Sequence, residues 1–420
     1  PDTVSVSYGR PFWTKSFEAF APPPVSKFSS VRYISSKFDI YVDDTEWGSK
    51  ITASAIDTFM NALENRAPQD STQGIFDLVT DYVGEIQDTD ENGKLIIEFT
   101  DILDEYDLGR NDTKSSLFIH GYINKADTSD IDIYSNMGDI IYLDVNPVAL
   151  DGSENDLNVL LHATVTELTK LAYFSNHPDQ EAWIVNGIGF MLQKLIIGNV
   201  RVFGESTDPA ITAGNQLTYI GSGLRALKSR DDQWNTYLFF SYLQEKFTAD
   251  STGWDIIQAI ASSSSVGINA VQDGLTSLGF PDLVEDVFAD YGMACYLDLE
   301  HINSEYGNAY SFAEFDLQTP PSGKPASVIT WDQGSGKGAP FSFKDIAPWS
   351  YNYVIMRGYF LNLEGEVVEL CPDLLPSDTL IFDGYDGISY RVKKLVLKNS
   401  FLTSINSDYE VADFSLNNDS

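Results

Sequence analysis

The sequence predicts an α+β protein, and three observations carry that prediction. The first 150 residues mix short alternating segments, typical of strands, with two segments of helical period. Residues 153–317 are dominated by helical periodicity. From about residue 325, short β-branched and aromatic segments are separated by Gly, Pro, Asp and Asn, which indicates strands. A chain of 420 residues is long enough for two or three hydrophobic cores.

These patterns divide the chain into four expected segments. Residues 1–36 carry a proline run without a clear period and are expected to be irregular. Residues 37–152 form an α/β part, and residues 153–317 form a helical part. Residues 325–420 are expected to form a β-sandwich-like domain, preceded by a Pro-, Gly- and Ser-rich linker at Gln318 to Ser327.

Each element of the first part follows from local periodicity. Residues 38–44 alternate and predict a strand, whereas residues 49–66 and 75–83 have helical spacing. The polar turn DTDENGK leads into the apolar run LIIEF, which predicts a turn followed by a buried strand. Two further strands are expected at residues 118–123 and 139–145.

The later elements follow from the same patterns. Helices are expected at residues 154–174, 179–198, 232–247, 253–262, 266–278 and 281–298. Strands of an antiparallel sheet are expected at VITWD, FSFKDI, YNYVIMRGYFLNL, GEVVELC, TLIFDG and YRVKKLVL.

The charge of the chain excludes one class of partner. Asp and Glu number 62 against 26 Lys and Arg, for a net charge of −36, which repels nucleic acid and anionic lipid headgroups. No segment has the ~18–20 uninterrupted apolar residues of a transmembrane helix. The chain begins at Pro1, so we expect a mature form whose signal sequence was removed, with a lipid anchor at the removed N-terminus left open. Two cysteines make no disulfide framework.

One predicted helix has the layout of a zinc-peptidase helix. In LLHATVTELTKL, residues 160–171, His162 and Thr166 are four residues apart and share a face. Two histidines at this spacing bind zinc in HExxH helices, where the glutamate is the general base. Taken alone, one histidine on a helix is more often structural than a metal ligand.

The order of several segments resembles a known family. SNMGDIIYLDVNP precedes the histidine helix, and EAWIVNGIGFMLQKL follows it. Then come YLFFSYLQEKF, WDIIQAIASSS, INAVQDGLTSLGF and LVEDVFADYGMACYLD. This run resembles the hyicolysin-like secreted metallopeptidases of the gluzincin type, with motifs similar to "YLDxxP", "LAHEFQHxI" and "WLNEGLAEY". DTDENGKLIIEF is similar to that family's "DxDGNGKIxILLxD". The resemblance covers roughly residues 38–298 and implies a gluzincin-like peptidase domain in a secreted or bacterial cell-surface protein.

The resemblance also implies that the catalytic residues are lost. The first zinc histidine corresponds to His162, the catalytic glutamate to Ala163, the second histidine to Thr166 and the third ligand to Asn186. Catalytic zinc takes three protein ligands and a water. One ligand of three is kept, so we expect no zinc and no peptidase activity.

Two other functions stay open. His162 with Glu167 or Glu181 would make an unconventional metal site in an active hydrolase. Glu167 points about 100° around the helix from the i+4 direction, and Glu181 is expected at a helix start, where an acid suits the dipole. Alternatively, the protein is a structural envelope protein or adhesin that acts through its C-terminal β domain.

A catalytically inactive relative would keep its cleft as a binding surface. We expect a peptide or protein ligand between the His162 helix and the strand near Ile140 to Val145. Pairing of an extended peptide with that strand, as a sheet edge, is the expected mode.

A calcium site is a further hypothesis. The segment D-T-D-E-N-G matches the first half of a calcium loop, but position twelve is Phe99 instead of a bidentate glutamate, so an EF-hand is excluded. A polar turn with Gly93 at positive φ is the simpler interpretation. A partial calcium site completed by Glu91 or by an acid from another loop stays open. Its candidate ligands are Asp88, Asp90 and Asn92.

Overall fold

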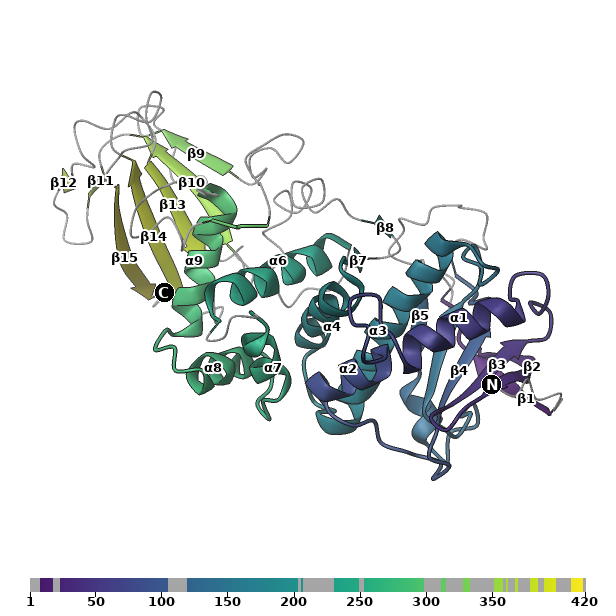
Figure 1. Ribbon diagram of the computed structural model, residues 1–420. Coiled ribbons are helices and arrows are strands. Elements are labelled where there is room, and N and C mark those ends of the chain that lie inside the picture. The colour runs from purple at the N-terminus through teal and green to yellow at the C-terminus, as the bar shows by residue number, and fades with distance from the viewer. Residues whose placement is uncertain are drawn as a thin grey trace. The chain divides into compact units, whose positions relative to one another are not determined.

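The computed structural model describes two units of the chain (Figure 1). The first comprises residues 1–207 with 260–270, and the second comprises residues 208–259 with 271–420. The described residues are 8–17, 23–104, 119–202, 205–206, 230–248, 253–297 and 311–314, together with the seven C-terminal strands given below.

The first unit is built on a six-stranded mixed sheet, so the α+β class is confirmed. The strand order is β1-β2-β3-β4-β6-β5. β3, β4 and β6 run parallel, whereas β1, β2 and β5 pair antiparallel with their neighbours. The strands are β1 (Gly9–Thr14), β2 (Val25–Ile34), β3 (Phe38–Asp43), β4 (Leu95–Thr100), β5 (Gly121–Ile123) and β6 (Ile140–Asp144).

The expectation of an irregular segment over residues 1–36 is wrong for β1 and β2. These strands form an antiparallel hairpin at the edge of the sheet. The sequence pattern hides β2 because its buried positions include the polar residues Ser29 and Ser30. Ser29 is tolerated in the interior because its hydroxyl donates to Glu98 Oε1 at 2.7 Å.

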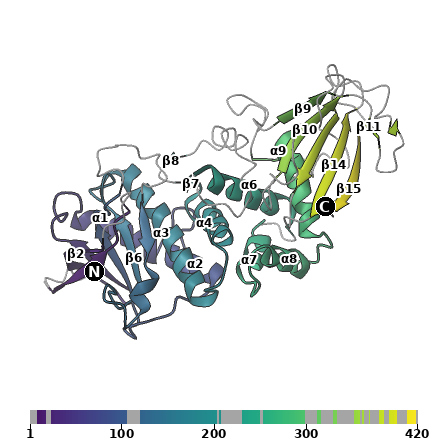
Figure 2. The same ribbon diagram turned by 180° about the vertical axis from the view of Figure 1, so that it is seen from behind.

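Helices cover the sheet of the first unit, at positions close to those expected (Figures 1 and 2). α3 contacts β5, β6, α2 and α4, so it is the central helix of this layer. Ser153 caps α3 by accepting the backbone N–H of Asp156. The helices are α1 (Ala53–Glu64), α2 (Ile75–Val83), the 3-10 turn η2 (Lys125–Thr128), α3 (Glu154–Asn176) and α4 (Ala182–Ile197).

The remaining predicted helices are also present. They are α6 (Arg230–Lys246), α7 (Asp255–Ala261), α8 (Ile268–Ser277) and α9 (Val284–Leu297). In the second unit, the Tyr291 ring contacts those of Phe239, Tyr242 and Phe312 and joins α9 to α6. A two-residue hairpin, β7 (Arg201–Val202) with β8 (Glu205–Ser206), follows α4.

The C-terminal strands form a five-stranded sheet and a two-stranded sheet. The order β15-β14-β13-β10-β9 is antiparallel except for β9, which pairs parallel with β10, so a wholly antiparallel sheet was the wrong expectation. FSFKDI and the expected linker lie outside the described residues. The strands are β9 (Val328–Asp332), β10 (Tyr351–Arg357), β11 (Phe360–Leu361), β12 (Val367–Val368), β13 (Asp378–Asp383), β14 (Ser389–Leu397) and β15 (Tyr409–Asn417).

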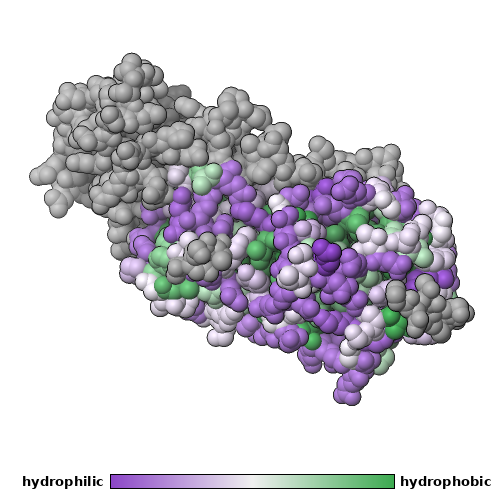
Figure 3. Space-filling view, in the orientation of Figure 1, coloured by the Kyte–Doolittle hydropathy of each residue, from purple (hydrophilic) through white to green (hydrophobic). Residues whose placement is uncertain are grey.

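The surface agrees with the acidic composition. On the face that Figure 3 shows, the described residues are mostly hydrophilic, with separate apolar patches. Among the described residues, no helix has the length and apolarity that crossing a bilayer requires.

Candidate functional site

His162 lies inside the fold with both ring nitrogens engaged. Its side chain is buried, and Nδ1 lies 2.7 Å from the carbonyl oxygen of Asn158, one turn earlier in α3. Nε2 lies 2.6 Å from Oδ1 of Asn199 and 3.2 Å from the backbone oxygen of the same residue. Burial lowers the pKa of His162. Neither nitrogen is directed at an open coordination position.

Thr166 belongs to the same interhelical network. Its hydroxyl donates to the His162 carbonyl at 3.1 Å and accepts from Gln193 Nε2 at 2.7 Å. Gln193 Oε1 in turn accepts the backbone N–H of Arg201 at 2.9 Å. The side chains of His162 and Thr166 therefore link α3 to α4 and to the segment that follows α4.

Asn186 is not brought to His162 and Thr166. It precedes Gln193 by seven residues on the same face of α4, which is about 10 Å along the helix axis. It lines a pocket with Lys170 and other residues near the C-terminal end of α3. α3 continues to Asn176 before the chain turns, so α4 returns in a register that places Gln193 opposite Thr166. Ala163 is buried in α3.

Glu167 and Glu181 have other partners. Glu167 is buried against β5, where its Oε1 accepts from Lys170 Nζ at 2.6 Å and its side chain lies against Gly121. Burial raises the pKa of Glu167. Glu181 is the N-cap residue of α4, as expected, and its Oε2 accepts from Trp183 Nε1 at 2.7 Å. Both carboxylates are therefore engaged with side chains of their own helices, Glu167 with Lys170 and Glu181 with Trp183.

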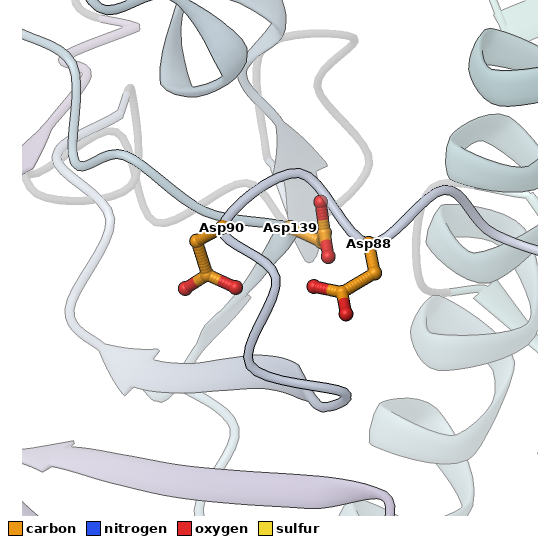
Figure 4. Close-up of side chains that lie close together, drawn as sticks. All are labelled: Asp88, Asp90 and Asp139. Carbon is orange, nitrogen blue, oxygen red and sulfur yellow. The ribbon is translucent and has the colours of Figure 1, made fainter.

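Three carboxylates do come together elsewhere. Oxygens of Asp88, Asp90 and Asp139 lie within 4.8 Å of one another, the one group with metal-ligand spacing among the described residues (Figure 4). Asp139 directly precedes β6 and is buried, and its Oδ1 accepts the Thr89 N–H at 2.9 Å. Burial raises the pKa of Asp90 and of Asp139. Oxygen ligands at this spacing suit a hard cation such as Ca²⁺.

Asn92 mainly shapes the turn that carries two of these acids. Its backbone N–H donates to Asp88 Oδ1 at 3.1 Å, and its Oδ1 accepts the Lys94 N–H at 2.6 Å. Glu91 and Gly93 have positive φ, of 57° and 74°. The expected Asx-rich turn is thus present. The local sequence pattern does not single out Asp139, because this residue is remote in sequence from the loop; it takes the place of the acid from another loop that the calcium hypothesis leaves open.

Two adjacent pockets lie beside the C-terminal half of α3. One, here called the α3–β5 pocket, has a volume of about 220 Å³. The other has about 310 Å³ and includes Asp139 in its wall. The two share Phe174 and Pro178. The α3–β5 pocket is lined by Ile123, Lys125, Lys170, Tyr173, Phe174, His177, Pro178, Gln180, Ala182, Val185 and Asn186.

The prediction that the strand near Ile140 to Val145 forms an edge of the sheet is wrong. β6, at residues 140–144, is an inner strand with β4 on one side and β5 on the other. β5 is the edge here because residues 121–123 fold back antiparallel onto β6. That edge is partly covered, since the buried Glu167 side chain lies against Gly121.

No protein-family model matches the chain, and no curated protein matches it either. The likeness to hyicolysin-like peptidases therefore stays a prediction that rests on the order of its motifs.

Proposed function

We propose that this protein is a catalytically inactive, metallopeptidase-like binding protein that holds a peptide or protein partner. The arrangement of His162 carries the proposal. A catalytic zinc needs three protein ligands with free lone pairs and one open position. Here both imidazole nitrogens face oxygens of Asn158 and Asn199, and the Thr166 hydroxyl is bonded to Gln193.

The architecture supports a peptidase-like origin. A mixed sheet followed by the α3–α4 hairpin is what the family resemblance implies for residues 38–298. A secreted or cell-surface location belongs to the same proposal. The binding surface that the geometry favours is the pair of pockets beside α3, because the inner strand β6 offers no free edge.

Metal analysis tests the loss of catalysis. The protein is purified without chelators, and its zinc content is measured beside a calorimetric zinc titration of wild type and His162→Ala. We expect no stoichiometric zinc, and no difference in zinc binding between the two proteins. One equivalent of tightly bound zinc that disappears in His162→Ala would refute the proposal and favour the hydrolase alternative, and a peptide-hydrolysis assay would follow.

Selection from a displayed random-peptide library tests the binding function. We expect enriched peptides that bind the intact chain and are not cleaved. Deletion of residues 325–420 separates this function from an adhesin. If binding to cells or matrix disappears with those residues, and no peptide is selected on the rest of the chain, the C-terminal β domain is the functional part.

Calcium binding at Asp88, Asp90 and Asp139 is a second, separate proposal, supported by the approach of three carboxylates from two loops. A site of extracellular type, with Kd of about 10⁻⁴–10⁻³ M, would stabilise the fold by roughly 1.4–2.7 kcal/mol in 10 mM CaCl₂. The measurement is thermal unfolding in CaCl₂ against equal MgCl₂. The increase in stability should vanish in Asp139→Asn and persist in Asp130→Asn, which changes an exposed aspartate outside the cluster. Equal curves in the two salts would exclude a selective site.

A further inference from the structure

The α3–β5 pocket has the size of one side chain. Its volume of about 220 Å³ lies below the roughly 300–1,000 Å³ of pockets for drug-sized ligands. Much of its wall is apolar, with Phe174 from α3, Ala182 and Val185 from α4, and Ile123 from β5. An occupant therefore places a single apolar group between the α3–α4 hairpin and the end of β5.

The charged groups of this pocket are mainly basic, against the trend of the whole chain. Lys125, Lys170 and His177 line it, in a protein with 26 Lys and Arg residues against 62 Asp and Glu residues. Glu167 neutralises Lys170. Lys125 is exposed, its Nζ lies 4.8 Å from the centre of the Phe174 ring, and it forms no ion pair within the described part of the chain. Its ammonium group is therefore available to an anion at the mouth of an apolar pocket.

A buried hydroxyl in the same wall lacks a hydrogen-bond partner. Tyr173 lines the pocket and is 2% exposed, and among the described residues nothing accepts from or donates to its hydroxyl. Burial raises the pKa of this group well above its usual value. A buried donor without an acceptor destabilises the fold, and such groups call for a specific explanation. The hydroxyl oxygen has less than 1 Å² of accessible surface, so an oxygen atom of a ligand becomes the missing acceptor once the ring turns toward the pocket.

The edge of the sheet does not favour a peptide that runs past the pocket as an added strand. β5 has only three residues, which is short for pairing with an added strand. Gly121 also lies against the Glu167 side chain, since a Cβ placed there would be 3.2 Å from Glu167 Cγ. Without backbone pairing, a ligand is held by the group that it inserts into the pocket and by the charge that it places near Lys125. A peptide C-terminus supplies both, an apolar side chain and a carboxylate, on one residue.

We propose that the α3–β5 pocket binds the C-terminal residue of a peptide. The apolar side chain packs against Phe174 and Val185, and the terminal carboxylate lies between the Lys125 ammonium and the Tyr173 hydroxyl. The proposal rests on the proposed binding function and names its ligand class.

Fluorescence polarisation with matched peptides tests it. The ligand is a fluorescein-labelled Gly-Ser-Gly-Ser-Gly-Phe with a free carboxylate, and its twin carries a C-terminal amide. We expect the acid to bind at least tenfold more tightly than the amide. Lys125→Glu should remove that preference, whereas Lys50→Glu, an equal charge change in the loop before α1, should leave it unchanged.

Two further variants keep the test independent of folding. Val185→Trp should fill the pocket and abolish binding. Tyr173→Phe should weaken binding about three- to tenfold while raising the melting temperature, because it removes an unsatisfied buried hydroxyl. Equal affinity for acid and amide, or a Lys125→Glu variant that binds as wild type does, overturns the proposal.

The source of the carboxylate is tested by competition. N-acetylphenylalanine should compete at least tenfold more weakly than the unlabelled peptide. Equal competition would replace the peptide end with a free apolar acid and overturn the proposal. If selected library peptides bind equally well with an amidated C-terminus and to the Lys125→Glu variant, that result would refute this inference and leave the proposed function standing. Zinc-dependent peptide hydrolysis would refute the proposed function itself.

Discussion

At the scale of single residues, Glu98 is a fully buried acid in the sheet of the first unit. It stands in the middle of β4 with no exposed surface, and burial raises its pKa to about 8. Its Oε1 accepts from the Ser29 hydroxyl, and the nearby carboxylate of Asp43 raises the pKa further. The side chain is therefore mostly protonated at neutral pH, and it forms hydrogen bonds as an uncharged carboxylic acid.

Replacing Glu98 by glutamine should change how stability depends on pH. In the unfolded chain the pKa is about 4.5, so between pH 4.5 and 8 the folded state binds one more proton than the unfolded state. This group thus stabilises the fold fully below pH 4.5, and its contribution falls as pH rises to 8. Glu98→Gln should flatten that slope, measured as urea unfolding free energy at pH 5, 6.5 and 8. An unchanged slope would contradict the raised pKa.

At the scale of elements, the α3–α4 hairpin is held by side chains that the predicted family resemblance aligns with zinc-ligand positions. His162 bonds to Asn199, just after α4, and Thr166 bonds to Gln193 near the C-terminal end of α4. These bonds set the register of the two helices. Polar groups buried between helices must be satisfied, so a partner lost on one helix leaves an unpaired group on the other.

Thr166→Val should therefore destabilise the fold by about 1–3 kcal/mol, since it leaves the Gln193 amide without its 2.7 Å acceptor. Thr58→Val is the matched control. Thr58 is an exposed residue of α1 whose hydroxyl donates only to the carbonyl of Ser54, one turn earlier. Urea unfolding measures both variants, and equal losses would show that the interhelical bond contributes nothing.

At the scale of the whole molecule, the net charge of −36 opposes folding through self-repulsion. Salt screens that repulsion over about 10 Å at 0.1 M. The melting temperature at pH 7.5 should rise between 20 and 500 mM NaCl. Near pH 4.5, where carboxylates begin to bind protons, the rise should be much smaller. A melting temperature that falls with salt at pH 7.5 would mean that attractive ion pairs outweigh the repulsion.

The sequence by itself determined the elements whose signal is local. Periodicity predicted α2 at its observed bounds, and it predicted α3 and α4 to within a few residues. It also predicted the turn around Gly93 and the N-terminal position of Glu181. These features depend on the spacing of apolar residues and on capping chemistry, which neighbouring residues set.

Only the tertiary structure decided which elements lie together. Thr166 meets Gln193 instead of Asn186, Asp139 joins Asp88, and β5 takes the sheet edge where β6 was expected. β1 and β2 enter the sheet although serines occupy buried positions. Each of these outcomes depends on contacts between segments far apart in the chain. Their energy comes from packing and hydrogen bonds that no local pattern encodes.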